Sequence, residues 1–242
     1  MNYNAARHLT FELEGVVIHA PADVVTPAIA TALSNQSYEA EEARIVRKAL
    51  RAGDRVLEVG SGLGFITALI GQDERCSALT AVEADPRLAR RVKSTVSENC
   101  ALDIDVLNGV LTSALGEAQS VPFYQRRDFW MSSMIETDVP ADLVVRVPLL
   151  DFNTMLRERR ITMLVCDIEG AEVDLFRHAD FAGVDRIVVE LHDHVNGLKA
   201  VSGLIADLAD KGFGYDPRCS EGSVVTFRKF GSCEDKRPYG LV

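Results

Sequence analysis

The feature that most constrains this chain is a buried strand that runs directly into a glycine-rich turn and then into a helix. An apolar run at residues 56–59 is typical of a parallel strand covered on both faces, and apolar residues recur at helical spacing from Phe65 to Ile70. The turn between them contains three glycines: Gly60, Gly62 and Gly64. Such a turn lets a ligand lie against backbone amides with no Cβ in the way, although glycines that serve only packing would give the same pattern.

The glycine spacing and the charge before it distinguish between ligand classes. A dinucleotide fingerprint has the spacing G-x-G-x-x-G and a P-loop ends in G-K-[ST], and this turn has neither. Glu58 precedes the first glycine by two residues, where it would repel a phosphate and suit a cation. An acid followed by G-x-G-x-G resembles motif I of the class I S-adenosylmethionine (SAM) methyltransferases, whose cofactor carries an ammonium and a sulfonium. The resemblance implies a cofactor site that includes Glu58, Gly60, Ser61, Gly62 and Gly64.

Composition limits the partners. The formal net charge of -10 argues against a nucleic-acid backbone as the main partner, because phosphate binding needs clustered Lys and Arg. No run is long enough for a transmembrane helix, and residues 1–4 lack a signal pattern. Five cysteines without a C-x-x-C pair favour reduced thiols over a disulfide framework or a zinc site. We therefore expect a cytoplasmic protein with no nucleic-acid or membrane partner, and a homodimer stays open.

The order of elements predicts an α/β fold. An alternating stretch at 9–18 reads as a small hairpin, and 38–50 as an amphipathic helix before the first core strand. Further strands and helices alternate until an antiparallel hairpin closes the chain. We expect a Rossmann-like, mostly parallel sheet in a domain at 38–242, preceded by an extension at 1–37. An irregular insert near 118–150, with the only tryptophan, reads as a lid or acceptor wall, or equally as packing.

Polar residues fall where the predicted strands end, which is where open α/β sheets bind ligands. Glu83 ends the second strand and can accept both hydroxyls of a ribose, with Ala84 beside it. The alternative is that Glu83 caps the next helix, a role that suits Asp85 better. Asn108 and Gly109 end the third strand, where class I methyltransferases hold the adenine of the cofactor.

The resemblance sharpens over residues 38–195. The stretches that carry it are Tyr38-Glu39, 56–64, 147–151, 187–192 and, most specifically, the D-x-E-G-A-E element at 167–172. Together they resemble the FkbM family of SAM-dependent methyltransferases. The resemblance implies methyl transfer to a hydroxyl of a sugar, polyketide or other small molecule, with Tyr38 in the cofactor site.

The acceptor needs a base beside it, because methyl transfer is an in-line displacement that also releases a proton. Asp167 at the fourth strand tip is the first candidate, followed by Glu169 and by His192 on the fifth strand. These residues, with Glu190 and His194, could also assemble a magnesium site, but no ligand spacing demands one. We expect catalysis without a metal.

Three other readings stay open. A nicotinamide oxidoreductase on a related sheet is disfavoured by the glycine spacing. A non-catalytic module would keep the cofactor pocket for stability or assembly. A methyltransferase with a nitrogen acceptor would use the same cofactor site as the hydroxyl enzyme.

Overall fold

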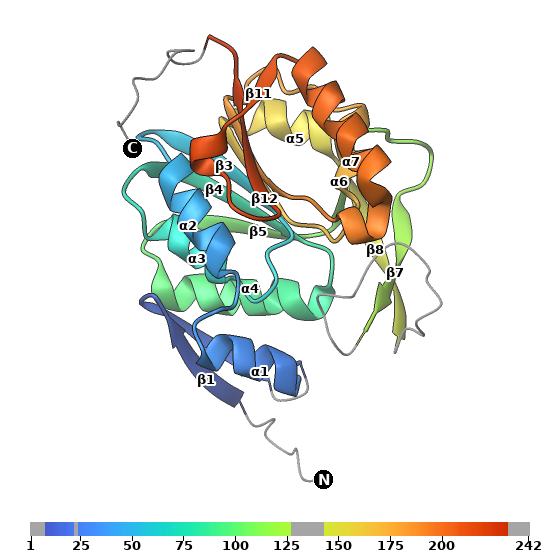
Figure 1. Cartoon of the computed structure of the whole chain (residues 1–242). Coiled ribbons are helices and arrows are strands. Elements are labelled where there is room, and N and C mark those ends of the chain that lie inside the picture. The colour runs from blue at the N-terminus through green and yellow to red at the C-terminus, as the bar shows by residue number, and fades with distance from the viewer. Residues whose placement is uncertain (1–7, 22–23, 127–142, 232–242) are drawn as a thin grey trace.

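The computed structural model describes residues 8–21, 24–126 and 143–231 (Figure 1). The strands are β1 (His8–Leu13), β2 (Val16–Pro21), β3 (Asp54–Val59), β4 (Cys76–Glu83), β5 (Ile104–Asn108), β6 (Val110–Thr112), β7 (Ser120–Gln125), β8 (Leu143–Asp151), β9 (Met163–Cys166), β10 (Arg186–Glu190), β11 (Phe213–Tyr215) and β12 (Val224–Lys229). The helices are α1 (Pro27–Ser34), α2 (Ala40–Ala49), α3 (Phe65–Gly71), α4 (Pro86–Asn99), α5 (Phe152–Glu158), α6 (Glu172–Arg177) and α7 (Asp193–Asp210), with a 3-10 turn at Pro217–Cys219.

A seven-stranded sheet forms the centre, in the order β11-β12-β10-β9-β3-β4-β5. Strands β10, β9, β3, β4 and β5 are parallel, and β12 pairs antiparallel with both β10 and β11. The sheet therefore confirms the predicted Rossmann-like fold with an antiparallel hairpin at one edge.

Helices cover both faces of this sheet, and Figure 1 shows α2, α3 and α4 on one side and α5, α6 and α7 on the other. Alternation along β3 explains how one strand serves both layers. Val56 packs in the core that contains residues of α2 and α3, whereas Leu57 packs with Phe152 of α5 and Phe176 of α6. Both faces of the strand are thus apolar, as expected for a parallel sheet between two helical layers.

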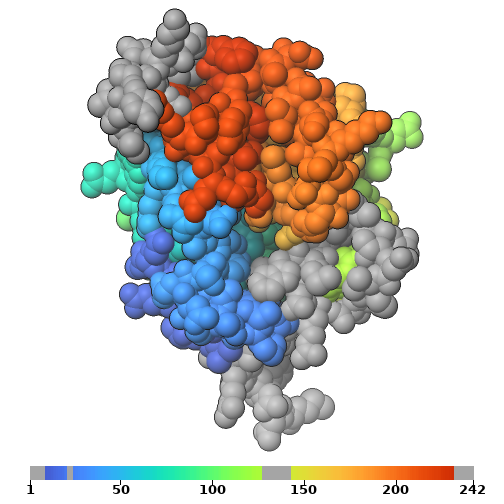
Figure 2. Space-filling model, viewed as in Figure 1, coloured from blue at the N-terminus to red at the C-terminus, as the bar shows by residue number. Residues whose placement is uncertain are grey.

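The predicted N-terminal hairpin is β1–β2, and it packs against the main body. Leu13, Val16 and Ile18 are buried in the same core as α2 and α3. The side chain of Asn99, at the end of α4, accepts a hydrogen bond from Val17 N and donates one to Val17 O, both at 2.8 Å. In Figure 2 the N-terminal segments (blue) lie below the C-terminal ones (orange to red). The division at residue 37 stays a prediction.

The insert contains a pair of strands. Strands β7 and β8 are antiparallel, with Val121 opposite Val147, and β6 adds to β8 in parallel to give a separate three-stranded sheet. Residues 127–142, including Phe129, Trp130 and Met134, lie outside the described residues. The prediction of a lid therefore stays a prediction.

Helix α7 begins earlier than its apolar pattern predicts. The sequence suggests a start at Leu198, whereas the structure begins the helix at Asp193 with a break at Gly197, whose φ is 75°. Because of this break, the apolar residues before Gly197 do not continue the helical spacing of those after it. The first turn of α7 therefore cannot be recognised from the apolar pattern of the sequence. No helix in the described part of the chain is long and apolar enough to cross a membrane.

Candidate active site

A cavity of about 680 Å³ opens at the carboxyl ends of the parallel strands. It is bounded by the glycine turn after β3, the tip of β4, the turn after β5, the loop after β9 and the N-terminus of α2. Its volume falls in the range of small-molecule and cofactor pockets. Eight of the predicted site residues line it: Tyr38, Gly60, Gly62, Glu83, Ala84, Gly109, Asp167 and Glu169.

Packing, as well as ligand access, requires glycine in the turn. Gly60 has φ 86°, and a Cβ built on it would lie 1.6 Å from the carbonyl oxygen of Asp167. Gly64 has φ 83°, and a Cβ built on it would lie 3.1 Å from the Cα atom of Val92 in α4. Gly60 lines the cavity, but Gly64 faces α4 instead. Packing therefore requires glycine at both positions, and the ligand contact at Gly60 stays a prediction.

Glu83 holds the glycine turn in place. Its Oε2 accepts hydrogen bonds from Ser61 N at 3.0 Å and Gly62 N at 2.9 Å, and its Oε1 accepts one from Asp85 N at 2.7 Å. Burial raises the pKa of Glu83 to about 7 against the opposing effect of these amides. A carboxylate has about four lone-pair positions, so acceptor capacity remains for a ribose hydroxyl. The cap of α4 is Asp85, whose side chain accepts from Arg87 N, with Pro86 first in the helix.

Besides Gly64, three residues of the predicted cofactor site lie away from the cavity wall. Glu58 is 1% exposed and Ser61 is 2% exposed, and neither lines the cavity. Burial, with the nearby charge of Glu83, raises the pKa of Glu58 to about 8. Asn108 donates its side-chain amide to the carbonyl oxygens of Glu83 and Ala84, both at 2.9 Å, so it fastens two strand ends together. We correct their expected role from direct contact to support of the wall.

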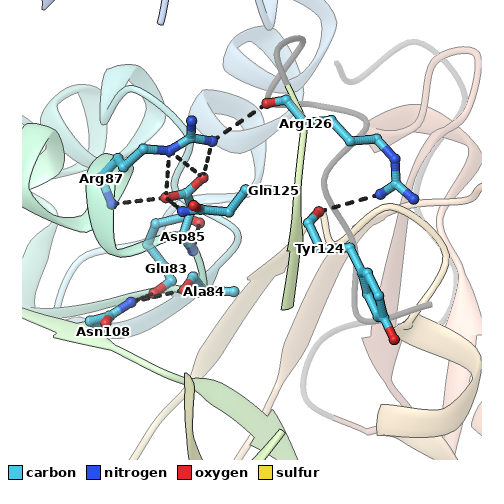
Figure 3. A network of polar contacts seen from close by, with 8 residues as sticks. All are labelled: Glu83, Ala84, Asp85, Arg87, Asn108, Tyr124, Gln125 and Arg126. Atoms are coloured by element: carbon cyan, nitrogen blue, oxygen red, sulfur yellow. Dashed lines mark hydrogen bonds and ion pairs between the residues drawn. The ribbon is translucent and has the colours of Figure 1, made fainter. Parts of the chain in front are cut away.

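The insert is tied to the cofactor end of the cavity by a polar network (Figure 3). Gln125, at the end of β7, donates its side-chain amide to Asp85 Oδ1 at 2.6 Å. Asp85 also forms an ion pair with Arg87 at 2.7 Å, and Arg87 donates to the carbonyl oxygen of Arg126 at 3.4 Å. Phe123 of the same strand lines the cavity. The network therefore holds one wall of the insert beside the expected adenine position.

The predicted catalytic residues meet at the tips of β9 and β10. His192 Nε2 lies 3.5 Å from Asp167 Oδ1 and 3.4 Å from Glu169 Oε2, while its Nδ1 lies 3.0 Å from Glu172 Oε1. Asp167 and Glu169 line the cavity, but His192 is 5% exposed and lies behind them. Glu169 adopts a left-handed backbone with φ 54°, a strained conformation that is often found at functional sites.

The crowded charges shift the pKa values of this group. Burial raises the pKa of Asp167 well above its usual range, and the charge of Glu169 adds to the effect. Burial also raises the pKa of Glu169 to about 7. For His192 burial acts downward, but the surrounding carboxylates outweigh it and raise the pKa to about 9. His192 lies behind the cavity wall, so the geometry does not support it as a base that contacts the acceptor.

Sequence reasoning missed acids at the start of α2. Glu39 and Glu42 line the cavity, and burial raises the pKa of each well above its usual range. Glu39 has a left-handed backbone with φ 49°. Glu39 beside Tyr38 was an available signal, because both belong to the stretch that carries the family resemblance.

Comparison with known proteins points to RNA-modifying enzymes. The family described as "Ribosomal RNA adenine dimethylase" matches residues 38–156. Relatives include Ribosomal RNA small subunit methyltransferase A of Bifidobacterium longum subsp. infantis, 52% identical over 56 residues, which are 23% of this chain and 18% of that protein. The protein of the same name from Corynebacterium diphtheriae is 43% identical over 67 residues, 27% of this chain and 22% of the relative. The chain thus matches only about a fifth of the length of these curated relatives.

Two solved structures illustrate the similarity in three dimensions. M. jannaschii TYW2 in complex with AdoMet has a TM-score of 0.47 at 10% identity, covering 95% of this chain and 90% of that one. Trm1 from Pyrococcus horikoshii with S-adenosyl-L-methionine has a TM-score of 0.48 at 11% identity, covering 91% and 61%. At this level of similarity neither structure indicates a substrate.

The comparisons correct the predicted family, acceptor and partner. The match is to an rRNA adenine dimethylase family, so the FkbM assignment is not supported, and a small-molecule hydroxyl acceptor and the absence of a nucleic-acid partner are both contradicted. Net charge misled because many acids face inward. Eight carboxylates line the cavity: Glu39, Glu41, Glu42, Glu83, Asp85, Asp167, Glu169 and Glu190. The value of -10 therefore does not measure the charge of the outer surface.

Both the strand-turn-helix pattern and the matched family span the cofactor half of the sheet. The cavity there is bordered by acids and suits a cation better than a phosphate. This chain has the Rossmann-like fold of the class I methyltransferases, with a cavity at the place where that fold binds its cofactor.

Proposed function

We propose that this protein transfers a methyl group from SAM to a nitrogen of an adenine base in RNA. The observation that carries the proposal is the family match over residues 38–156, which include the glycine turn, Glu83 and the insert strand β7. The identity of the RNA, and of the adenine within it, is part of the proposal, because the matched segments are short relative to the whole relatives.

The proposed cofactor position follows the cavity wall. The ribose lies against Glu83, which retains acceptor capacity beside the amides of the turn. The adenine of the cofactor lies between Gly109 and Phe123, and the methionine end lies toward Tyr38 and Glu39. A carboxylate near the ammonium stabilises it by charge, and the buried surroundings strengthen that attraction.

Asp167 is the proposed contact to the acceptor. Its carboxyl lines the cavity at the tip of β9, directly after the strand that adjoins the glycine turn. An exocyclic amine loses a proton when it takes the methyl group, and the sulfonium departs as a neutral thioether. A carboxylate that accepts a hydrogen bond from the amine orients it for in-line attack and can receive that proton. Cofactor binding favours ionised Asp167, because a nearby positive charge lowers a carboxyl pKa.

The experiment is transfer of isotope-labelled methyl from SAM to RNA, followed by digestion and mass spectrometry of the nucleosides. We expect labelled adenosine that carries the methyl group on a base nitrogen. We expect Asp167→Ala to lose most of the activity, and Asp174→Asn, at an exposed acid of α6, to retain it. Label confined to ribose, or SAM binding without any RNA label, would contradict the proposal.

The proposed substrate also bears on location and assembly. An RNA substrate of this kind is consistent with the cytoplasmic location predicted from the cysteines, which stays a prediction. The homodimer also stays open.

A further inference from the structure

The ends of the adjacent strands β9 and β10 bring together two carboxylates and one imidazole at the border of the cavity. Ligand atoms of Asp167, Glu190 and His192 all lie within 4.8 Å of one another. Ligands bound to one cation at roughly 2.1 Å lie about 3–4 Å apart, so small side-chain rotations would close this group around an ion. We propose that Asp167, Glu190 and His192 form a binding site for a divalent cation of the Mn²⁺ class.

The buried imidazole is the observation that separates this group from a chance cluster of acids. His192 is 5% exposed, and each of its ring nitrogens faces a carboxylate. Its Nε2 faces Asp167 at 3.5 Å, and Asp167 Oδ1 is itself a buried atom with no hydrogen-bond partner among the described residues. Buried polar atoms are rarely left unpaired, so Asp167 Oδ1 calls for a ligand on the side that His192 Nε2 faces.

Glu172 holds the imidazole in the orientation that a ligand needs. Its Oε1 accepts hydrogen bonds from Ile168 N at 3.1 Å and Gly170 N at 3.2 Å, which fixes the carboxylate. The same oxygen lies 3.0 Å from His192 Nδ1 and favours a proton on that nitrogen. Nε2 is then the nitrogen that faces Asp167. A carboxylate behind the far nitrogen is the usual support of a metal-binding histidine.

Charge balance favours a cation at this position. Glu169 adds a further carboxylate 3.4 Å from His192 Nε2. Among the described residues that line the cavity, the only Lys or Arg is Arg44, which pairs with Glu221 at 2.8 Å. No described Lys or Arg therefore neutralises the carboxylates at the strand tips from the cavity side.

The donor set selects the class of ion. Carboxylate oxygens suit Mg²⁺, Ca²⁺ and Mn²⁺, whereas imidazole nitrogen suits transition metals, and Mn²⁺ accepts both. Asp167 and Glu190 line the cavity, so the remaining coordination positions of the ion would face it. The sequence-based expectation of a metal-free site is the alternative that the experiment must separate from this proposal.

The test is titration of the full chain with Mn²⁺, followed by electron paramagnetic resonance without SAM or RNA. We expect one saturable site per chain. Asp167→Asn and Glu190→Gln should each weaken Mn²⁺ binding at least tenfold, whereas Asp174→Asn should leave it unchanged. Nitrogen modulation of the Mn²⁺ signal should appear in the wild type and vanish in His192→Gln. Circular dichroism checks the fold of each variant. Two carboxylate variants are used so that the test still holds if one of them does not fold.

The proposal is overturned if the wild type shows no saturable Mn²⁺ binding. Equal binding by wild type and both carboxylate variants would also overturn it, because the ion would then lie elsewhere. A third contrary result is displacement of Mn²⁺ by S-adenosylhomocysteine, which would assign the acids to the ammonium of the cofactor. None of these readouts depends on RNA methylation, so the metal site and the proposed function can fail separately.

Discussion

The carbonyl oxygen of Asp167 lies where a side chain on Gly60 would begin. A Cβ on Gly60 would be 1.6 Å from that oxygen, so the glycine turn and the tip of β9 are in direct backbone contact. The contact follows from the pairing of β3 with β9, in which Val59 is opposite Cys166. It places the predicted cofactor turn and the proposed acceptor contact on one wall of the cavity.

The first prediction concerns this contact. Gly60→Ala adds both a clash with backbone and a side chain at φ 86°, so we expect a loss of roughly 2–4 kcal/mol of unfolding free energy. Gly53→Ala is the matched control, because Gly53 has φ 85° and open space around its Cβ position. Its cost should be about 1 kcal/mol. Urea unfolding measures both, and equal losses would refute the clash.

The second prediction concerns Glu83 and cofactor affinity. Its pKa is raised to about 7 by burial, and its ionised form is the one that best accepts from the turn amides and a ribose. Below pH 7 the group gains a proton in the free protein, so SAM affinity should fall by up to about tenfold per pH unit. Glu83→Gln should bind SAM weakly with little pH dependence. Calorimetry from pH 5.5 to 8.5 measures the SAM affinity of both proteins. A wild-type affinity that does not change with pH would count against this role of Glu83.

The third prediction concerns the stability effect of Glu58. Its folded-state pKa of about 8 lies above the ordinary 4.5, so the folded state binds the proton more tightly than the unfolded chain does. Below pH 4.5 Glu58 is protonated in both states and does not lower the free energy of unfolding. As the pH rises from 4.5 to about 8, Glu58 lowers the free energy of unfolding by an increasing amount. Glu58→Gln should therefore raise the free energy of unfolding above that of the wild type, and this gain should be roughly 1–3 kcal/mol larger at pH 9 than at pH 5.

Denaturant unfolding at both pH values measures this difference. Glu74→Gln, at an exposed acid, provides the control and should show none. If the Glu58 variant were less stable than the wild type at pH 9, the ionised carboxylate would be satisfied in a way that the structure does not show.

Sequence patterns predicted the fold well because they report local and repeated constraints. The apolar runs of β3, β4, β9 and β10 and the cap of α4 by Asp85 each depend on nearby residues alone. The start of α7 was missed because Gly197 breaks its periodicity.

The site was harder to predict, because it depends on which strand faces which. Position after a strand identified Glu83 and Asp167 correctly as cavity residues, but it could not tell that Glu58 is buried away from the cavity wall or that His192 lies behind Asp167. The acceptor was predicted wrongly, since the fourth-strand element that suggested it lies outside the matched residues 38–156. Net charge failed for a related reason: it cannot separate acids inside the cavity from those on the surface.

The most direct measurement is a crystal structure with S-adenosylhomocysteine bound. We predict the ribose hydroxyls at Glu83, the adenine between Gly109 and Phe123, and the sulfur facing Asp167 across open space that can admit a base. An empty cavity at saturating ligand, or a sulfur directed away from Asp167, would contradict the account.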